Sequence, residues 1–131
     1  MNTRMHAVLA LSSFPLFLGA LLSDWAYYTS HQIQWVNFAA WLMAGGLLIV
    51  GPVLLWGAID LLRSPSTRHG SSMIYLSLLL ATFVVGFLNA LIHAKDGWAA
   101  MPTGLILSAL VVVLAATANV VGLAASLRRT A

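Results

Sequence analysis

Residues 71–98 read SSMIYLSLLLATFVVGFLNALIHAKDGW, and this stretch decides the fold. No Asp, Glu, Lys or Arg occurs between positions 71 and 94. At about 1.5 Å per residue, a helix of that length crosses the roughly 30 Å hydrocarbon core of a bilayer. Its polar residues recur at heptad spacing: Tyr75, Thr82, Asn89 and Asp96 fall on one line, with Gly86 and His93 beside them. Because an unpartnered amide or imidazole is costly in hydrocarbon, we expect this stripe to face other helices.

The composition of the rest of the chain extends this interpretation to all 131 residues. The chain is 61% hydrophobic and 7% charged, whereas soluble domains carry about a quarter charged residues. We therefore predict one all-α integral membrane domain over residues 1–131, a four-helix bundle with helices at about 6–28, 35–62, 71–93 and 102–127. The chain has no Cys, which excludes disulfides and thiolate metal sites, and it has no basic stripe of the kind that binds nucleic acid.

The basic residues predict how the bundle is oriented. Lys95 falls in the connection between the third and fourth predicted helices, and every other basic residue falls at the opposite end. These are Arg4, Arg63, Arg68, Arg128 and Arg129. Because short cytoplasmic loops carry the excess of Lys and Arg, both termini are expected in the cytoplasm.

Small and polar residues predict which helix faces pack together, since they let helix backbones approach closely in lipid. The predicted inward faces are His6, Ser13, Gly19, Ala20, Ser23 and Asp24 in the first helix, Asn37, Ala44, Gly51 and Ala58 in the second, and Gly104, Ser108, Ala115, Ala118, Gly122 and Ser126 in the fourth. Bends are expected at Pro15 and at Gly51-Pro52.

A polar cluster is expected near the end of the bundle that carries Lys95. Its members are Asp24, Asn37, Asn89, His93 and Asp96. Two interpretations stay open. The cluster ties the helices together by hydrogen bonds, or it handles protons or a ligand at a mouth centred on His93 and Asp96.

The four histidines raise the question of haem. His6 and His69 belong to the arginine-rich end, and His31 and His93 to the other end. Paired axial histidines on facing helices hold haem in membrane cytochromes. Each of these four residues lies within about one turn of a predicted helix end, however, whereas axial ligands normally lie deeper inside a bundle. We therefore expect no cofactor, with haem b as the alternative, and no metal site, because no spacing matches a ligand motif.

Several motifs resemble those of a known family. They are Asp24-Trp25, Trp56-Gly57-Ala-Ile-Asp60, Asn89-Ala-Leu-Ile-His93-Ala-Lys-Asp96-Gly-Trp98 and Pro102-Thr-Gly-Leu-Ile-Leu-Ser108. The chain resembles a group of small bacterial four-helix membrane proteins known only as a domain of unknown function. It departs from their pattern at Ala7, where members often have proline, and at Val121-Gly122-Leu123, where members are richer in glycine. The resemblance implies a bundle in the bacterial inner membrane, and some members are joined to or encoded near redox proteins.

The sequence contains no catalytic Ser/His/Asp set, phosphate-binding loop or pair of buried carboxylates, so we expect no enzyme activity. No ionisable residue lies in the middle of a predicted span, which argues against proton-coupled transport. The expected function is that of a non-catalytic accessory or assembly subunit, in contact with lipid and with copies of itself or a larger complex. The alternative is a b-type haem or quinone-proximal electron-transfer subunit.

Overall fold

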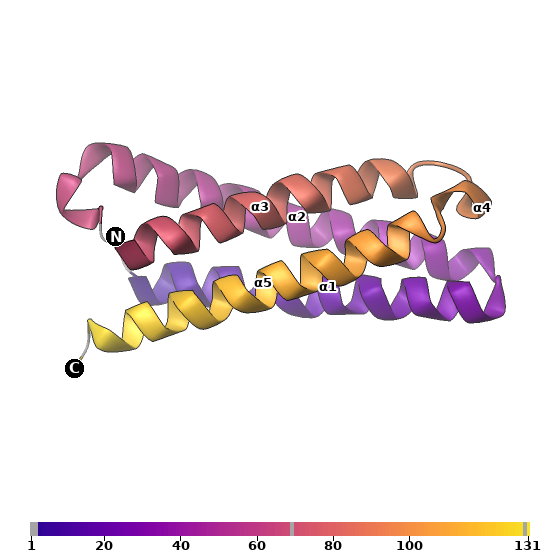
Figure 1. Ribbon diagram of the computed structural model, residues 1–131, viewed down its shortest axis with the longest axis horizontal. Helices are drawn as coiled ribbons and strands as arrows, with labels where there is room; N and C mark the ends of the chain where they lie inside the picture. Colours follow the sequence, from indigo (N-terminus) through magenta and orange to yellow (C-terminus); the bar gives the residue numbers. More distant parts are fainter. Residues whose placement is uncertain (1–2, 69, 130) are drawn as a thin grey trace.

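The computed structural model describes residues 3–68, 70–129 and 131, and these form a bundle of four long helices (Figure 1). The long helices are α1 (Thr3–Ser30), α2 (Ile33–Arg63), α3 (Gly70–His93) and α5 (Thr103–Arg128). Two short elements lie in the connections: the 3-10 helix η1 (Pro65–Thr67) and the single-turn helix α4 (Gly97–Ala100). All four long helices are long and apolar enough to cross a membrane. The prediction of an all-α membrane bundle is confirmed.

The helices are arranged so that each long helix has two neighbours. α1 packs against α2 and α5, and α3 packs against α5 and α2, so α1 and α3 face each other across the bundle. Both termini and the α2–α3 connection lie at one end, on the left in Figure 1. The arginines therefore gather at that end, and Lys95 lies at the other end with α4.

The helix boundaries agree with the predicted ones to within a few residues, with one correction. The connection at 94–101, for which the sequence predicts no helix, contains the short helix α4 in its second half. The backbone N–H groups of Ala99 and Ala100 donate to the Asp96 carbonyl oxygen and close this turn. Both helices that contain a proline, α1 with Pro15 and α2 with Pro52, continue as single helices.

The inward faces of α1 and α3 are those predicted from the small and polar residues. In α3 the buried residues are Tyr75, Leu79, Thr82, Gly86, Asn89 and His93. In α1 the buried residues include His6, Ser13, Ala20, Ser23 and Asp24. The polar stripe of α3 therefore faces the other helices, as expected, except for Asp96, which lies beyond the end of α3 and is exposed.

The inward face of α2 differs from the prediction by about one residue. Its buried line is Val36, Ala39, Met43, Gly46, Val50, Val53 and Gly57, not the heptad of Asn37, Ala44, Gly51 and Ala58. Gly46 is part of this line because a Cβ there would collide with the ring of Phe17, which is fully buried. Packing around this large ring favours a register that turns Asn37 outward, where its side chain is exposed.

Candidate functional site

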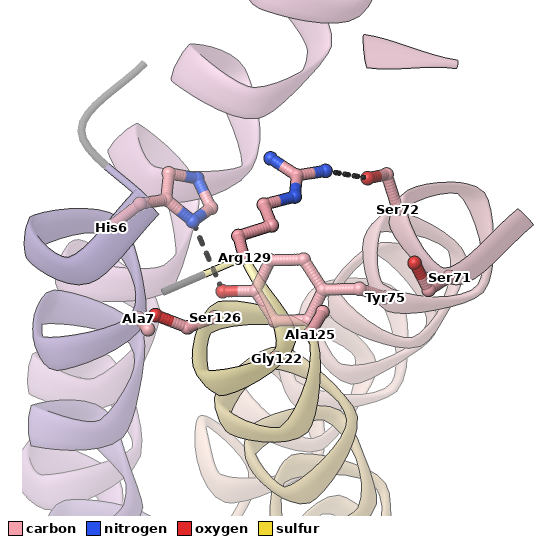
Figure 2. A pocket seen from close by; sticks show the side chains of 9 residues that line it. All are labelled: His6, Ala7, Ser71, Ser72, Tyr75, Gly122, Ala125, Ser126 and Arg129. Carbon is pink, nitrogen blue, oxygen red and sulfur yellow. Dashed lines mark hydrogen bonds between the residues drawn. The ribbon is translucent and has the colours of Figure 1, made fainter. Parts of the chain in front are cut away.

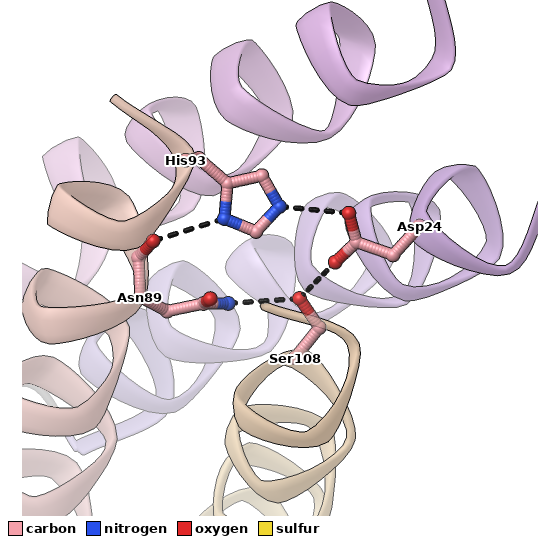
Figure 3. A network of polar contacts seen from close by, with 4 residues as sticks. All are labelled: Asp24, Asn89, His93 and Ser108. Atoms are coloured by element: carbon pink, nitrogen blue, oxygen red, sulfur yellow. Dashed lines mark hydrogen bonds and ion pairs between the residues drawn. The ribbon is translucent and has the colours of Figure 1, made fainter. Parts of the chain in front are cut away.

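Four polar side chains from three helices meet inside the bundle near the end opposite the arginines (Figure 3). They are Asp24 of α1, Asn89 and His93 of α3, and Ser108 of α5. Asp24, Asn89 and Ser108 have no exposed surface, and His93 is 5% exposed. The network therefore joins the diagonal pair α1 and α3 both directly, through Asp24 and His93, and through Ser108 of α5.

Asp24 lies at the centre of this network. Its Oδ1 is 2.7 Å from His93 Nε2, and its Oδ2 accepts a hydrogen bond from the Ser108 hydroxyl. The other ring nitrogen of His93, Nδ1, is 2.9 Å from the backbone carbonyl oxygen of Asn89. Each oxygen of this buried carboxylate therefore has a partner, which is the condition under which a carboxyl group is tolerated inside a membrane protein.

The proton count of the His93–Asp24 pair follows from these contacts. A carbonyl oxygen only accepts hydrogen bonds, so Nδ1 carries a proton when it bonds to Asn89. Nε2 then either donates to a carboxylate or accepts from a protonated carboxyl group. The pair has no net charge in either arrangement, and the two arrangements differ by one proton transfer along the 2.7 Å contact.

The side-chain amide of Asn89 is better satisfied with its oxygen and nitrogen exchanged, two atoms of nearly the same shape, because the drawn orientation points the oxygen only at hydrogen-bond acceptors. In the orientation drawn in Figure 3 the amide nitrogen donates to the Ser108 hydroxyl oxygen at 2.8 Å. In the reversed orientation the nitrogen donates to the Gly104 carbonyl oxygen at 3.3 Å, and the amide oxygen accepts from the backbone N–H of Ser108 at 3.2 Å. Asn89 therefore bonds to Ser108 in either orientation.

Gly104 makes room for the His93 ring. A Cβ at this position would lie 3.1 Å from Cε1 of the ring, closer than ordinary packing allows. Helix α5 thus contributes a glycine beneath the imidazole and a hydroxyl four residues later, on the same face. Ser108 was predicted only as part of the small-residue face. Its spacing with Gly104 indicates that the hydroxyl lies on the same inward face, but not which groups it contacts.

The arrangement is not that of a serine hydrolase. In a catalytic triad the histidine lies between the serine and the acid and takes the proton of the serine hydroxyl. Here the acid lies between Ser108 and His93, so the histidine has no contact through which it could activate the hydroxyl. What the geometry shows is a set of hydrogen bonds between helices, with one proton between Asp24 and His93.

Two residues of the predicted polar cluster lie outside this network. Asn37 is exposed on the outer face of α2, because the register of that helix turns it away from the bundle. Asp96 is exposed, and its backbone carbonyl oxygen accepts the bonds that begin α4. The structure thus pairs His93 with Asp24 and leaves Asp96 at the surface, so the buried part of the predicted cluster is Asp24, Asn89 and His93.

A second polar contact, at the arginine-rich end, joins α1 to α2 and to α3. His6 of α1 is 2% exposed. Its Nε2 is 2.8 Å from the Val53 carbonyl oxygen of α2, and its Nδ1 is 3.1 Å from the Tyr75 hydroxyl oxygen of α3. No sequence pattern indicates this contact, because the partners are far apart in the chain and Val53 contributes only its backbone.

The other predicted haem ligands are placed differently. His31 has a positive φ of 59° after the end of α1, and its exposed ring lies beside the rings of Tyr27 and Trp98. His69 lies outside the described residues. Among the residues that the structure describes, no three His, Asp or Glu side chains come together as a group that could hold a metal ion.

The comparison with family models found one family for this chain. The model described as "Predicted membrane protein (DUF2231)" matches residues 3–130. The chain belongs to this family. Membership in the DUF2231 family confirms the resemblance to a domain of unknown function and identifies the chain as a membrane protein, but the family's description assigns no activity. No curated protein and no solved structure matched the chain.

Proposed function

We propose that this DUF2231 protein is a non-catalytic accessory or assembly subunit of the bacterial inner membrane, associated with copies of itself or with a larger complex. The closed network around Asp24 is the observation that supports this proposal. Its buried polar groups bond to one another and bridge three helices, so they stabilise the bundle and present no reactive group to a substrate.

The small-residue faces are used inside the bundle, so a partner must contact another surface. In α5 the buried residues include Gly104, Ser108, Ala115, Ala118 and Ser126. The outer face of α2 instead carries a heptad of large exposed side chains: Trp41 at 79%, Leu48 at 75%, Leu55 at 61% and Leu62 at 75%. A heptad line is the pattern by which two helices pack along their length. We place the contact with a partner on this face.

Site-specific crosslinking in native membranes tests the proposal. A photo-crosslinking residue at Leu48 should capture a second copy or another membrane protein, which mass spectrometry of the purified adduct identifies. Val113 of α5 is also exposed, at 59%, and serves as the matched control. If Leu48 and Val113 both crosslink only to lipid, and the chain purifies alone from mild detergent, the accessory function is refuted.

The haem alternative requires a rearrangement of the buried histidines. Both ring nitrogens of His6 and both of His93 contact groups of the same chain. An axial ligand must give up one of these contacts to reach iron. The absorption spectrum of the protein purified from native membranes decides the matter: a Soret band lost in His6→Ala or His93→Ala would favour haem over the accessory function.

A further inference from the structure

Two small cavities open at the end of the bundle that carries the arginines. The first, of about 40 Å³, is bordered by α1, α3 and α5 (Figure 2). The second, of about 30 Å³, is bordered by α2 as well. His6, Ser72, Tyr75 and Arg129 line both. The two cavities therefore adjoin and form one recess, which the predicted orientation places at the cytoplasmic surface.

The first cavity has the chemistry of an anion site. The Arg129 guanidinium reaches across it and donates to the Ser72 hydroxyl at 3.0 Å. The hydroxyl groups of Ser71 and Ser126 also line it, and none of its nine described lining residues is acidic. Asp60 lines only the second cavity, on the side of α2. The fork of N–H donors on a guanidinium matches the oxygens of a phosphate group, so a phosphate fits the first cavity best.

An apolar groove continues from this recess along the outside of the bundle. It follows the α2–α3 seam, the least closely packed of the four helix pairs, and has a volume of about 420 Å³. Its walls run from Leu61 to Gly51 on α2, a span of about 15 Å at the rise of a helix. Leu61 and Leu76 line both the groove and the second cavity. The groove thus reaches about half-way through a roughly 30 Å hydrocarbon core, the depth of one leaflet.

We propose that the recess and groove together bind one phospholipid with a net negative head. The phosphate lies beside Arg129 and Ser72, and one acyl chain lies between α2 and α3. The positive charge of the arginines at this end of the bundle favours an anionic phospholipid, because arginines attract anionic lipids to a cytoplasmic surface. The Arg68 Nε donates to the carbonyl oxygen of Leu61 at 3.2 Å, which holds a second guanidinium at the rim of the groove. The site does not depend on the accessory function proposed above.

Native mass spectrometry of the full chain in detergent measures this binding directly. The probes are phosphatidylglycerol, phosphatidylcholine and inorganic phosphate, each titrated separately. We expect one phosphatidylglycerol to bind at least about tenfold more tightly than phosphatidylcholine, a difference that corresponds to about 1.4 kcal/mol. Inorganic phosphate at the same concentrations should not displace the lipid, because it lacks the acyl chain.

Two pairs of variants test the contribution of the recess and the contribution of the groove to lipid binding separately. Arg129→Gln should weaken phosphatidylglycerol binding about tenfold, whereas Arg128→Gln should change it less than about threefold, since Arg128 does not line the recess. Ala58→Phe fills the groove and should abolish tight binding. Ala109→Phe places the same ring on an exposed position of α5 and should not affect it.

The outcomes that would overturn the proposal are distinct. Equal losses in Arg129→Gln and Arg128→Gln would mean that only the general surface charge attracts the lipid. Unchanged binding in Ala58→Phe would mean that no chain occupies the groove, and displacement by inorganic phosphate would mean that the recess holds an anion without a lipid. If Ala58→Phe fails to fold, Ser77→Phe, at an exposed residue of the same groove, takes its place.

Discussion

The buried network makes a quantitative prediction for the replacement of Asp24. In Asp24→Leu, His93 and Ser108 no longer have the carboxylate to which they are bonded, and both remain inside the bundle. In Asp24→Asn, the amide nitrogen can donate to His93 Nε2 while Nδ1 keeps its proton, and the amide oxygen can accept from the Ser108 hydroxyl. The two variants therefore have nearly the same backbone environment and differ in how many hydrogen bonds survive.

The expected change in stability follows from the hydrogen bonds that each variant breaks. An interhelical hydrogen bond in a membrane protein contributes about 0.6 kcal/mol on average and up to about 1.7 kcal/mol. Leaving a buried group without a partner costs about 1–3 kcal/mol. Because Asp24→Leu breaks the bonds to both His93 and Ser108, it should lower the free energy of unfolding by about 2–3 kcal/mol. Asp24→Asn should cost less than about 1 kcal/mol, because both bonds can be re-formed.

Reversible unfolding in mixed micelles of a mild detergent and dodecyl sulfate, followed by tryptophan fluorescence, measures these differences. Asp96→Leu is the matched control: Asp96 is an exposed acid at the same end of the bundle, and its replacement should change stability by less than about 0.5 kcal/mol. The double variant Asp24→Leu/His93→Leu removes both partners at once. It should lose at least about 1 kcal/mol less than the two single variants combined, because no unpaired imidazole remains.

Two results would refute this reasoning. If Asp24→Leu is as stable as Asp96→Leu, the network does not hold the helices together. If the loss of unfolding free energy in the double variant equals the sum of the losses in the two single variants to within about 0.5 kcal/mol, Asp24 and His93 act independently. The 2.7 Å contact between them would then contribute nothing to stability.

Two further predictions concern packing and orientation. Gly46→Val should lower the free energy of unfolding by about 1–3 kcal/mol in the same assay, because its side chain collides with the buried Phe17 ring; Gly70→Val, with no atom near its Cβ, should be clearly milder. Because the chain has no native cysteine, single cysteines report topology. A membrane-impermeant maleimide should label Ala99→Cys in intact spheroplasts but Ser66→Cys only after lysis, and the reverse labelling would overturn the predicted orientation.

The sequence was sufficient to predict the four spans, their approximate boundaries and the inward faces of α1 and α3. The reason is that a bilayer imposes one strong rule: uncharged stretches of sufficient length cross it, and polar side chains within them turn toward protein. The stripe of Tyr75, Thr82, Asn89 and His93 has strongly polar members and so follows this rule clearly. The line predicted for α2 had only Asn37 as a strongly polar member, so polarity gave little information about which face of α2 turns inward.

Which groups touch was decided by the tertiary structure alone. The register of α2 depends on the fit between Gly46 and the Phe17 ring, a matter of volume that hydropathy does not encode. The pairing of His93 with Asp24 instead of the nearby Asp96 depends on the place where α3 ends and on the position of α1 across the bundle. Helix periodicity gives the direction in which a side chain points, but its partner is fixed only when separate helices pack at a particular depth and rotation.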